Sequence, residues 1–232
     1  MTEILSYFVS GEKAAAFLHG QFTNDIKGLS PGQGNYNLLL TQKGKVRADL
    51  FIYRDEGGFY LLIPKPFSEI VISHLQKLAT LSRVKIAETQ NFAFLQPQIA
   101  DLPFNLDKTT RVENGVPLVG HDVTEENFPQ EGRLDHALHF NKGCYLGQEI
   151  IARLHYRGHV NKILSRFVVE SEESVPEGEP IFFEDKAVGK ITSSVFSPKF
   201  QNNVVLGYVP YNQKDESRFF QMGNHKKRGR IL

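Results

Sequence analysis

The chain has 232 residues, 41% hydrophobic and 23% charged, which is the composition of a folded globular protein and excludes a disordered one. Lys and Arg number 27 against 26 Asp and Glu, so the net charge of +1 does not indicate a surface built broadly for duplex nucleic acid. No apolar run approaches the roughly 20 residues of a membrane span, and the first residues lack a secretory pattern, so we expect a cytoplasmic protein without membrane contact.

Helix and strand patterns alternate over the first part of the chain. Ser10 can cap a helix that runs to about His19. The run over 45–54 alternates in hydropathy as a strand does, and the Asp-Glu-Gly-Gly segment that follows it is typical of a hairpin turn. We therefore predict an α+β unit whose mostly antiparallel sheet is covered on one face. Its predicted elements are helices over 10–19 and 67–80 and strands over 36–41, 45–54, 59–63, 83–88 and 92–95.

The remaining chain divides into a connecting region and a second strand-rich part. Residues 96–133 are richer in Pro, Gly, Asn and Asp, which favours turns and few long elements. A helix is predicted to begin after Gly147 and to end near Gly158. Toward the C-terminus, closely spaced short runs favour a small β-barrel or sandwich. Strands are predicted there over 163–169, 180–183, 188–192 and 204–209.

Basic side chains gather in two segments. Residues 225–230 read His-Lys-Lys-Arg-Gly-Arg, which is either a solvated tail or a phosphate-binding patch. The second segment, residues 153–159, follows the start of the predicted helix. It could hold the anionic tail of a ligand, because Arg pairs well with carboxylates. It contains His155 and His159, but no third residue has diagnostic metal-ligand spacing, so we predict no metal site.

Cys144 is the one cysteine of the chain, which excludes an internal disulfide and a zinc site of several thiolates. Glycines stand on both sides of it and permit tight backbone turns. A helix start and the neighbouring Lys142 would both favour the thiolate over the thiol. The alternative is that Cys144 is a small buried hydrophobe, as free cysteines often are.

The octapeptide Lys142–Glu149, Lys-Gly-Cys-Tyr-Leu-Gly-Gln-Glu, resembles the signature of the YgfZ family. The residues just after it, up to the Tyr-Arg-Gly of 156–158, continue the resemblance. Similar landmarks are spread over most of the chain, at 17–25, 44–53, 128–135, 189–194 and 206–209.

The resemblance implies the fold of the glycine-cleavage T-protein, in which mostly antiparallel α+β units surround a central opening and a small β-barrel follows. It implies an α+β folate-binding-type domain over 1–95, an abbreviated middle region with the cysteine motif over 96–160, and a barrel over 161–232. Tetrahydrofolate or a derivative is the implied ligand. The family supports the assembly or repair of iron–sulfur enzymes and thereby tRNA modification, which implies client or assembly proteins as partners and possible contact with a transient cluster.

Site residues follow from the same resemblance. Cys144 would be the functional thiol, and Lys142 would keep it charged. Asp49 and Glu113 are candidate pterin acceptors, because a carboxylate can accept two parallel hydrogen bonds from the ring and its amine; the alternative for both is solvent exposure. The other candidate folate contacts are Asn24, Tyr145, Gln148, Glu149 and Arg153.

Whether the protein is an enzyme stays open at this point. The T-protein carries two adjacent acids where this chain reads Ala48-Asp49-Leu50, and the lost acid argues against aminomethyl transfer. A folate-dependent aminomethyl- or methyltransferase is nevertheless the second hypothesis. A direct RNA-binding module that uses the basic residues near the end ranks below both.

Overall fold

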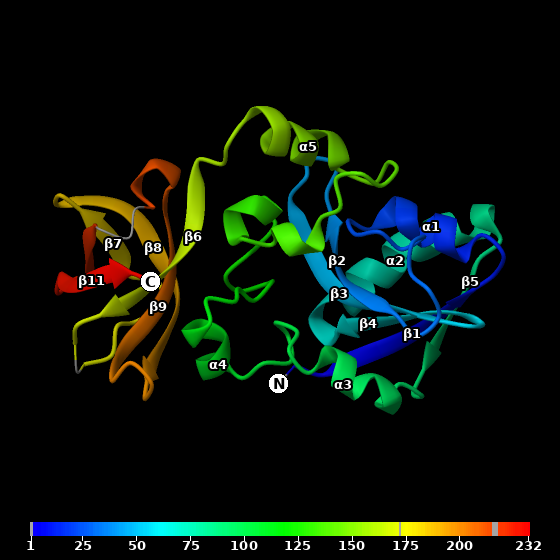
Figure 1. Ribbon diagram of the computed structural model, residues 1–232, viewed down its shortest axis with the longest axis horizontal. Coiled ribbons are helices and arrows are strands. Elements are labelled where there is room, and N and C mark those ends of the chain that lie inside the picture. Colours follow the sequence, from blue (N-terminus) through cyan, green and yellow to red (C-terminus); the bar gives the residue numbers. More distant parts are fainter. Residues whose placement is uncertain (1, 172, 215–217) are drawn as a thin grey trace. The chain divides into compact units, whose positions relative to one another are not determined.

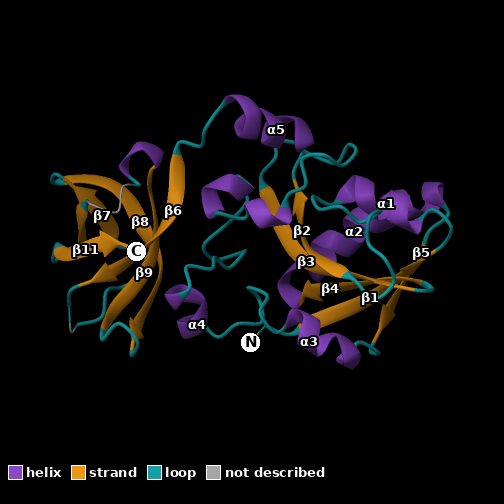
Figure 2. Ribbon diagram, in the orientation of Figure 1, coloured by secondary structure: helices purple, strands orange, loops and turns teal. Residues whose placement is uncertain are grey.

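The computed structural model describes residues 2–171, 173–214 and 218–232, and they form two compact units (Figures 1 and 2). The first unit comprises the chain up to Asn105 and Leu134–Tyr156, and the second comprises Leu106–Arg133 and the chain from Arg157 onward. The region 96–160, which we treated as one middle segment, is therefore shared between the two units. Among the helices described, none is long and apolar enough to cross a membrane.

An antiparallel five-stranded sheet in the order β2-β3-β4-β1-β5 forms the first unit (Figure 1). The strand periodicity of the sequence predicts most of it correctly, including the hairpin in which Asp55 pairs with Gly58. The bounds are β1 Ile4–Ser10, α1 Ala14–Gln21, β2 Gly34–Leu40, β3 Val46–Asp55, β4 Gly58–Pro64, α2 Lys65–Ser82 and β5 Lys85–Thr89.

The sheet is buried on both faces, although one covered face was expected. Ala48, Leu50 and Ile52 of β3 pack with α1 and α2 in one core cluster. The opposite face also holds buried side chains, among them Phe51. Phe94 and Phe104 lie against aromatic rings of that face, so the segment that follows β5 supplies the second cover. The short elements of this unit are η1 Ala93–Leu95, α3 Gln96–Ile99, η3 Asp135–Ala137 and α5 Gln148–Arg157, whose last residue belongs to the second unit.

Two local predictions in this unit were wrong. The helix starts at Ala14, because Ser10 ends a strand that was not predicted and no side chain caps the helix. The run 92–95 is not a strand, since η1 and α3 occupy this stretch. In both places a short apolar run has no clear period, so pairing and packing partners decide its conformation.

The expected C-terminal barrel is confirmed as a closed barrel of six strands in the order β10-β11-β6-β9-β8-β7. Inward-facing apolar residues such as Phe167, Val205 and Phe220 fill it. The basic residues near the end are not a free tail, because β11 pairs with β6 and β10 while Arg228 and Arg230 stay exposed. The bounds are β6 Lys162–Val169, β7 Pro180–Phe183, β8 Lys186–Ser197, β9 Asn202–Pro210, β10 Phe219–Met222 and β11 Lys227–Ile231, with η4 Tyr211–Gln213.

A buried ion pair fastens the segment 106–133 to the outside of this barrel. Arg111 of α4 (Lys108–Glu113) donates to Asp122 and, at 2.8 Å, to the hydroxyl of Ser193. Asp122 Oδ1 also accepts hydrogen bonds from Thr192 at 2.5 Å and from Ser193 at 2.7 Å. A β-bulge between Ile191 and Ser193 lets these two successive hydroxyls reach one carboxylate, which a regular strand would not allow. The segment also contains η2, Pro129–Gly132.

Asp122→Asn should lower the free energy of unfolding by about 3–5 kcal/mol, because it leaves the buried Arg111 guanidinium without its counter-charge. Urea unfolding followed by circular dichroism measures this in a chain without tryptophan. Asp185→Asn, which breaks an exposed pair with Lys226, is the matched control and should barely move the midpoint. Equal effects of the two substitutions would contradict the anchoring role of Asp122.

Candidate functional site

The Lys142 side chain holds the cysteine loop against a turn that comes early in the chain. Its Nζ donates to the backbone carbonyls of Phe22 and Asn24, each at 2.6 Å, and lies 5.1 Å from the centre of the Tyr145 ring. Burial lowers the pKa of Lys142 to about 7, while Asp25 acts in the opposite direction. The Nζ of Lys142 is thus committed to the two carbonyls and works as an anchor in the described structure.

A second contact fixes the far end of the loop. Gly147 has φ +81°, and a Cβ there would lie 2.6 Å from the carbonyl oxygen of Thr41 and 3.0 Å from Cα of Gly44. Only glycine tolerates both the positive φ and this close approach. The backbone N–H of Tyr145 donates to Oε1 of Gln148 at 3.3 Å, which ties the loop to the first residue of α5. The predicted helix start after Gly147 is confirmed.

Between these two fixed ends, Cys144 is exposed. The alternative of a small buried hydrophobe is therefore wrong, because the neighbours Lys142 and Tyr145 take the buried positions of the loop. An exposed thiol on an anchored loop is accessible to a reagent or to a partner. The structure describes no group of three or more His, Cys, Asp or Glu residues that could hold a metal.

The Tyr145 hydroxyl is buried and has no hydrogen-bond partner among the described residues. Burial raises the pKa of Tyr145 to about 12, so the hydroxyl keeps its proton and remains a donor at neutral pH. Native structures rarely leave a buried polar atom unpaired without a reason, and a ligand contact is one such reason. Tyr145, a predicted folate contact, therefore has a chemical property that fits the role.

Asp49 and Asn24 meet at the tyrosine of β2. Tyr36 donates its hydroxyl to Oδ2 of Asp49 at 2.7 Å, and its backbone carbonyl accepts from the Asn24 amide at 3.1 Å. Asp49 is only 1% exposed, and burial raises its pKa to about 7, with the Tyr36 hydrogen bond opposing. Because Asn24 also accepts from Lys142, one chain of contacts runs from Asp49 to the cysteine loop.

The remaining predicted contacts are not part of this chain. Glu149 and Arg153 pair with each other at 3.0 Å on the exposed side of α5, with 87% and 68% of their side chains accessible. Glu113 lies in the second unit, where its carboxylate accepts from the Ser197 hydroxyl and its backbone carbonyl from Arg166. His155 stacks on Phe140 with ring centres 3.8 Å apart, which explains its place without a metal.

Two residues beside the loop were missed as site candidates. His19 is buried and its Nδ1 accepts from the backbone N–H groups of Ile26 and Lys27, both at 3.3 Å, while Nε2 would lie 3.9 Å from a Cβ on Gly143. Burial, with the charge of Lys142 second, lowers the pKa of His19. Tyr36 is the second residue that was missed. Side chains alternate along a strand, which puts Tyr36 on the same face of the sheet as Asp49, and this alternation could have identified Tyr36 as a site candidate.

Two family models match the chain. The model of the GCVT N-terminal domain covers residues 1–98, and that of the glycine cleavage T-protein C-terminal barrel domain covers residues 162–230. A tRNA-modifying protein YgfZ from Buchnera aphidicola is 25% identical over 72% of this chain and 71% of its own length. An aminomethyltransferase from Chlorobium phaeobacteroides is 22% identical over 88% of this chain and 78% of its own.

A solved structure agrees with these matches. The glycine cleavage system aminomethyltransferase T from Bartonella henselae superposes with a TM-score of 0.84, covering 98% of this chain and 82% of that one. At 18% identity this likeness establishes the fold, which is the predicted one. The two domain models and the relatives show that the chain belongs to the YgfZ-type, glycine-cleavage-T-protein-like family.

Proposed function

We propose that this protein binds tetrahydrofolate or a derivative and supports the assembly or repair of iron–sulfur enzymes, and thereby tRNA modification, with Cys144 as its functional thiol. The observation that carries the proposal is the exposed Cys144 on a loop whose two ends are anchored by Lys142 and Gly147. Packing does not need a cysteine at an exposed position, so its chemistry is the better reason for it.

The single thiol bears on how the protein would act. Iron–sulfur clusters are usually held by four protein ligands, most often cysteines, and this chain has one cysteine in all. Cys144 would therefore act with groups that a client or assembly protein supplies, and any cluster would be cargo. A fixed loop suits this role because it presents the sulfur in one position to an incoming partner.

The folate proposal rests on the family and on two chemical features of the first unit. Tyr145, the residue after Cys144, offers a buried hydroxyl donor that has no hydrogen-bond partner among the described residues. Asp49, buried below Tyr36, is a carboxyl group with a pKa of about 7 that can accept hydrogen bonds when ionised. Lys142 would hold the loop in place for the ligand. Asn24, which is hydrogen-bonded to both Lys142 and Tyr36, would fix the position of the loop relative to Tyr36.

Aminomethyl or methyl transfer is the second candidate, and the fold shared with the Bartonella enzyme is the observation in its favour. Against it, Ala48 and Leu50 both lie in the helix-side core, which leaves Asp49 as the only acid at 48–50. Turnover of an aminomethylated lipoyl carrier with tetrahydrofolate would establish the transferase. Intact folate binding without turnover would eliminate it.

Tyr145→Phe should weaken tetrahydrofolate binding by roughly three- to tenfold, because the ligand loses one hydrogen bond worth about 0.5–1.5 kcal/mol. It should not lower the unfolding midpoint, since the hydroxyl has no described partner in the free protein. Calorimetry under reducing, anaerobic conditions measures the affinity. Tyr156→Phe on the exposed surface of α5 is the control, and equal affinities of the two variants would remove Tyr145 from the folate site.

Cys144→Ser and Cys144→Ala should bind tetrahydrofolate like the wild type and fail to restore iron–sulfur enzyme activity and tRNA thiomethylation in cells that lack this protein. Both substitutions are at an exposed position, so folding should be unaffected. Ser193→Ala, which alters a buried hydroxyl in the other unit, controls for a general loss of stability. Full restoration by Cys144→Ala would end the thiol hypothesis while leaving folate binding intact.

The anchor of the loop should show in the pH dependence of stability. The folded pKa of Lys142, about 7, lies below the ordinary value of 10.5, so between these pH values the unfolded chain holds a proton that the folded protein has released. Stability from this group therefore rises with pH in that interval. The cost of burying the ammonium is present in full below pH 7.

Compared with Lys142→Met, the wild type should gain up to about 2 kcal/mol in free energy of unfolding between pH 7 and pH 9. Urea unfolding at each pH measures the difference. Lys77→Met, at an exposed position of α2, is the matched control and should show a constant difference. A constant difference for Lys142→Met as well would mean that the carbonyls keep the ammonium charged throughout.

A further inference from the structure

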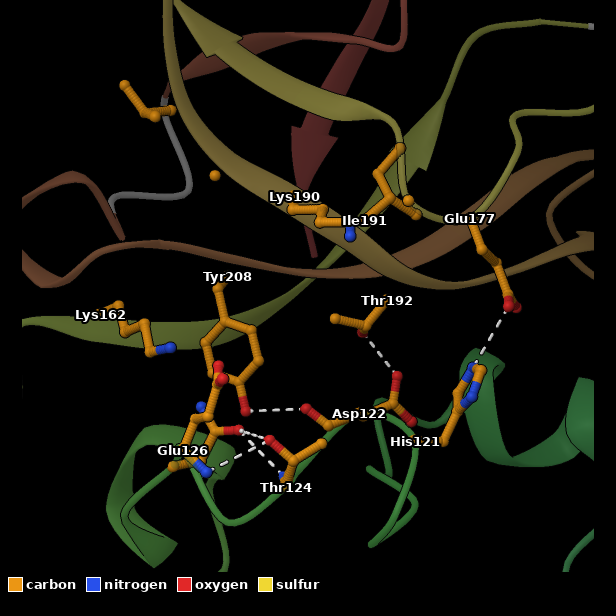
Figure 3. Close-up of a pocket in the computed structure, with 14 residues that line it drawn as sticks. His121, Asp122, Thr124, Glu126, Lys162, Glu177, Lys190, Ile191, Thr192 and Tyr208 are labelled. Carbon is orange, nitrogen blue, oxygen red and sulfur yellow. Dashed lines mark hydrogen bonds and ion pairs between the residues drawn. The ribbon is translucent and has the colours of Figure 1, made fainter.

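A cavity of about 610 Å³ lies within the second unit, on the outside of the barrel (Figure 3). The β6, β8 and β9 strands form one side of it, and the loop around His121–Asn127 forms the other. Its size falls in the range of pockets that hold small organic molecules, roughly 300–1,000 Å³. None of the residues proposed above for folate or for the thiol lines it.

The acidic side chains at the cavity are already engaged. Asp122 is buried and receives hydrogen bonds from Arg111, Thr192 and Ser193. Glu177 pairs with Lys108 at 2.8 Å and lies 3.3 Å from the ring nitrogen of His121, as Figure 3 shows for the histidine. Glu126 also has an interaction partner.

The two lysines at the cavity differ in this respect from its acidic side chains. Lys162 and Lys190 line the cavity, and neither has a carboxylate partner in the part of the chain that the structure describes. Lys162 Nζ lies 4.8 Å from the centre of the Tyr208 ring. Because the carboxylates of Asp122 and Glu177 are engaged with other donors, the two ammonium groups are available for charge-assisted hydrogen bonds to an anion.

Strand register explains why the lysines flank one tyrosine. Lys190 of β8 is paired directly with Tyr208 of β9, and Leu164 of β6 is paired with Tyr208 from the other side. Lys162 is two residues from Leu164, so it lies on the same face, diagonal to Tyr208. Adjacent strands are about 4.8 Å apart and residues rise about 3.4 Å along a strand, so two strand steps and an offset of two residues separate the two lysine backbones by roughly 12 Å. Their long side chains can converge on one ligand across that distance.

The floor between the lysines is rigid. Tyr208 donates its hydroxyl to the backbone carbonyl of Asp122 at 3.0 Å, and Asp122 is itself fixed by the buried ion pair. Gly189 allows the close approach of β8 to β9, because a Cβ there would lie 1.7 Å from the carbonyl oxygen of Tyr208. A preformed floor reduces the ordering cost of binding.

From this geometry we propose a second ligand site in the barrel unit, in which Lys162 and Lys190 bind the phosphoryl or carboxylate group of a small organic anion above Tyr208. The cavity is larger than one phosphate or carboxylate needs, so the remainder of the molecule lies toward Thr192 and the His121–Glu177 pair. Phosphoryl and carboxylate groups satisfy the lysines by the same charge-assisted hydrogen bonds.

Calorimetry with pyrophosphate and with citrate, in a low-salt chloride buffer, tests the site and distinguishes its two chemistries. We expect saturable binding of at least one anion with a sub-millimolar Kd. Lys162→Gln and Lys190→Gln should each weaken it by roughly fivefold or more, since each removes one charge-assisted hydrogen bond. Preference for pyrophosphate identifies a phosphoryl ligand, and preference for citrate identifies a carboxylate ligand.

Lys186→Gln is the matched control, because this lysine is on the same strand, is exposed, carries the same charge and does not line the cavity. It should change the Kd less than twofold. A loss equal to that of the cavity variants, or no saturable binding of either anion by the wild type, overturns the proposal. Circular dichroism confirms that each variant is folded, and unchanged anion binding by Tyr145→Phe separates this site from the folate proposal.

Discussion

The buried amino group of Lys142 joins two distant parts of the first unit, and the arrangement of the candidate site depends on it. Lys142 binds the backbone carbonyls of Phe22 and Asn24, which precede it by 120 and 118 residues. These carbonyls belong to the backbone just after α1, so they position a donor more strictly than mobile side chains do. Cys144 and Tyr145 follow two and three residues after Lys142, the first exposed and the second buried.

In the barrel unit a buried acidic side chain anchors a distant segment in a similar way. Asp122 is a buried anion that receives donors from α4, from β8 and from its own loop. Such a group is costly to bury unless every lone pair is used, and here the β-bulge of β8 supplies the additional hydroxyl. The anchored loop then forms one wall of the cavity that Lys162 and Lys190 line, so a structural ion pair positions one side of the proposed second ligand site.

Local pattern predicted much of the fold, and the exceptions have one cause. The strands of the β2–β3–β4 meander and the start of α5 follow from hydropathy period, a Gly-containing hairpin and a glycine before the helix. The strands β1, β10 and β11 were missed, because their side chains have no clear alternation and because β10 and β11 are short. Each is stabilised by strands far away in sequence, as β11 is by β6.

By itself, the sequence determined the family, the order of an α+β part and a barrel, and the cysteine motif, because these depend on residue types at fixed local spacing. Only the tertiary structure decided that Cys144 is exposed and that Lys142 binds carbonyls. It also decided that Tyr36 donates a hydrogen bond to Asp49 and that Glu149 and Arg153 pair with each other. These properties depend on groups more than one element apart, and on burial, which sets the cost of each charge. A sequence shows which side chains are present, whereas only the packed chain determines which partners they find.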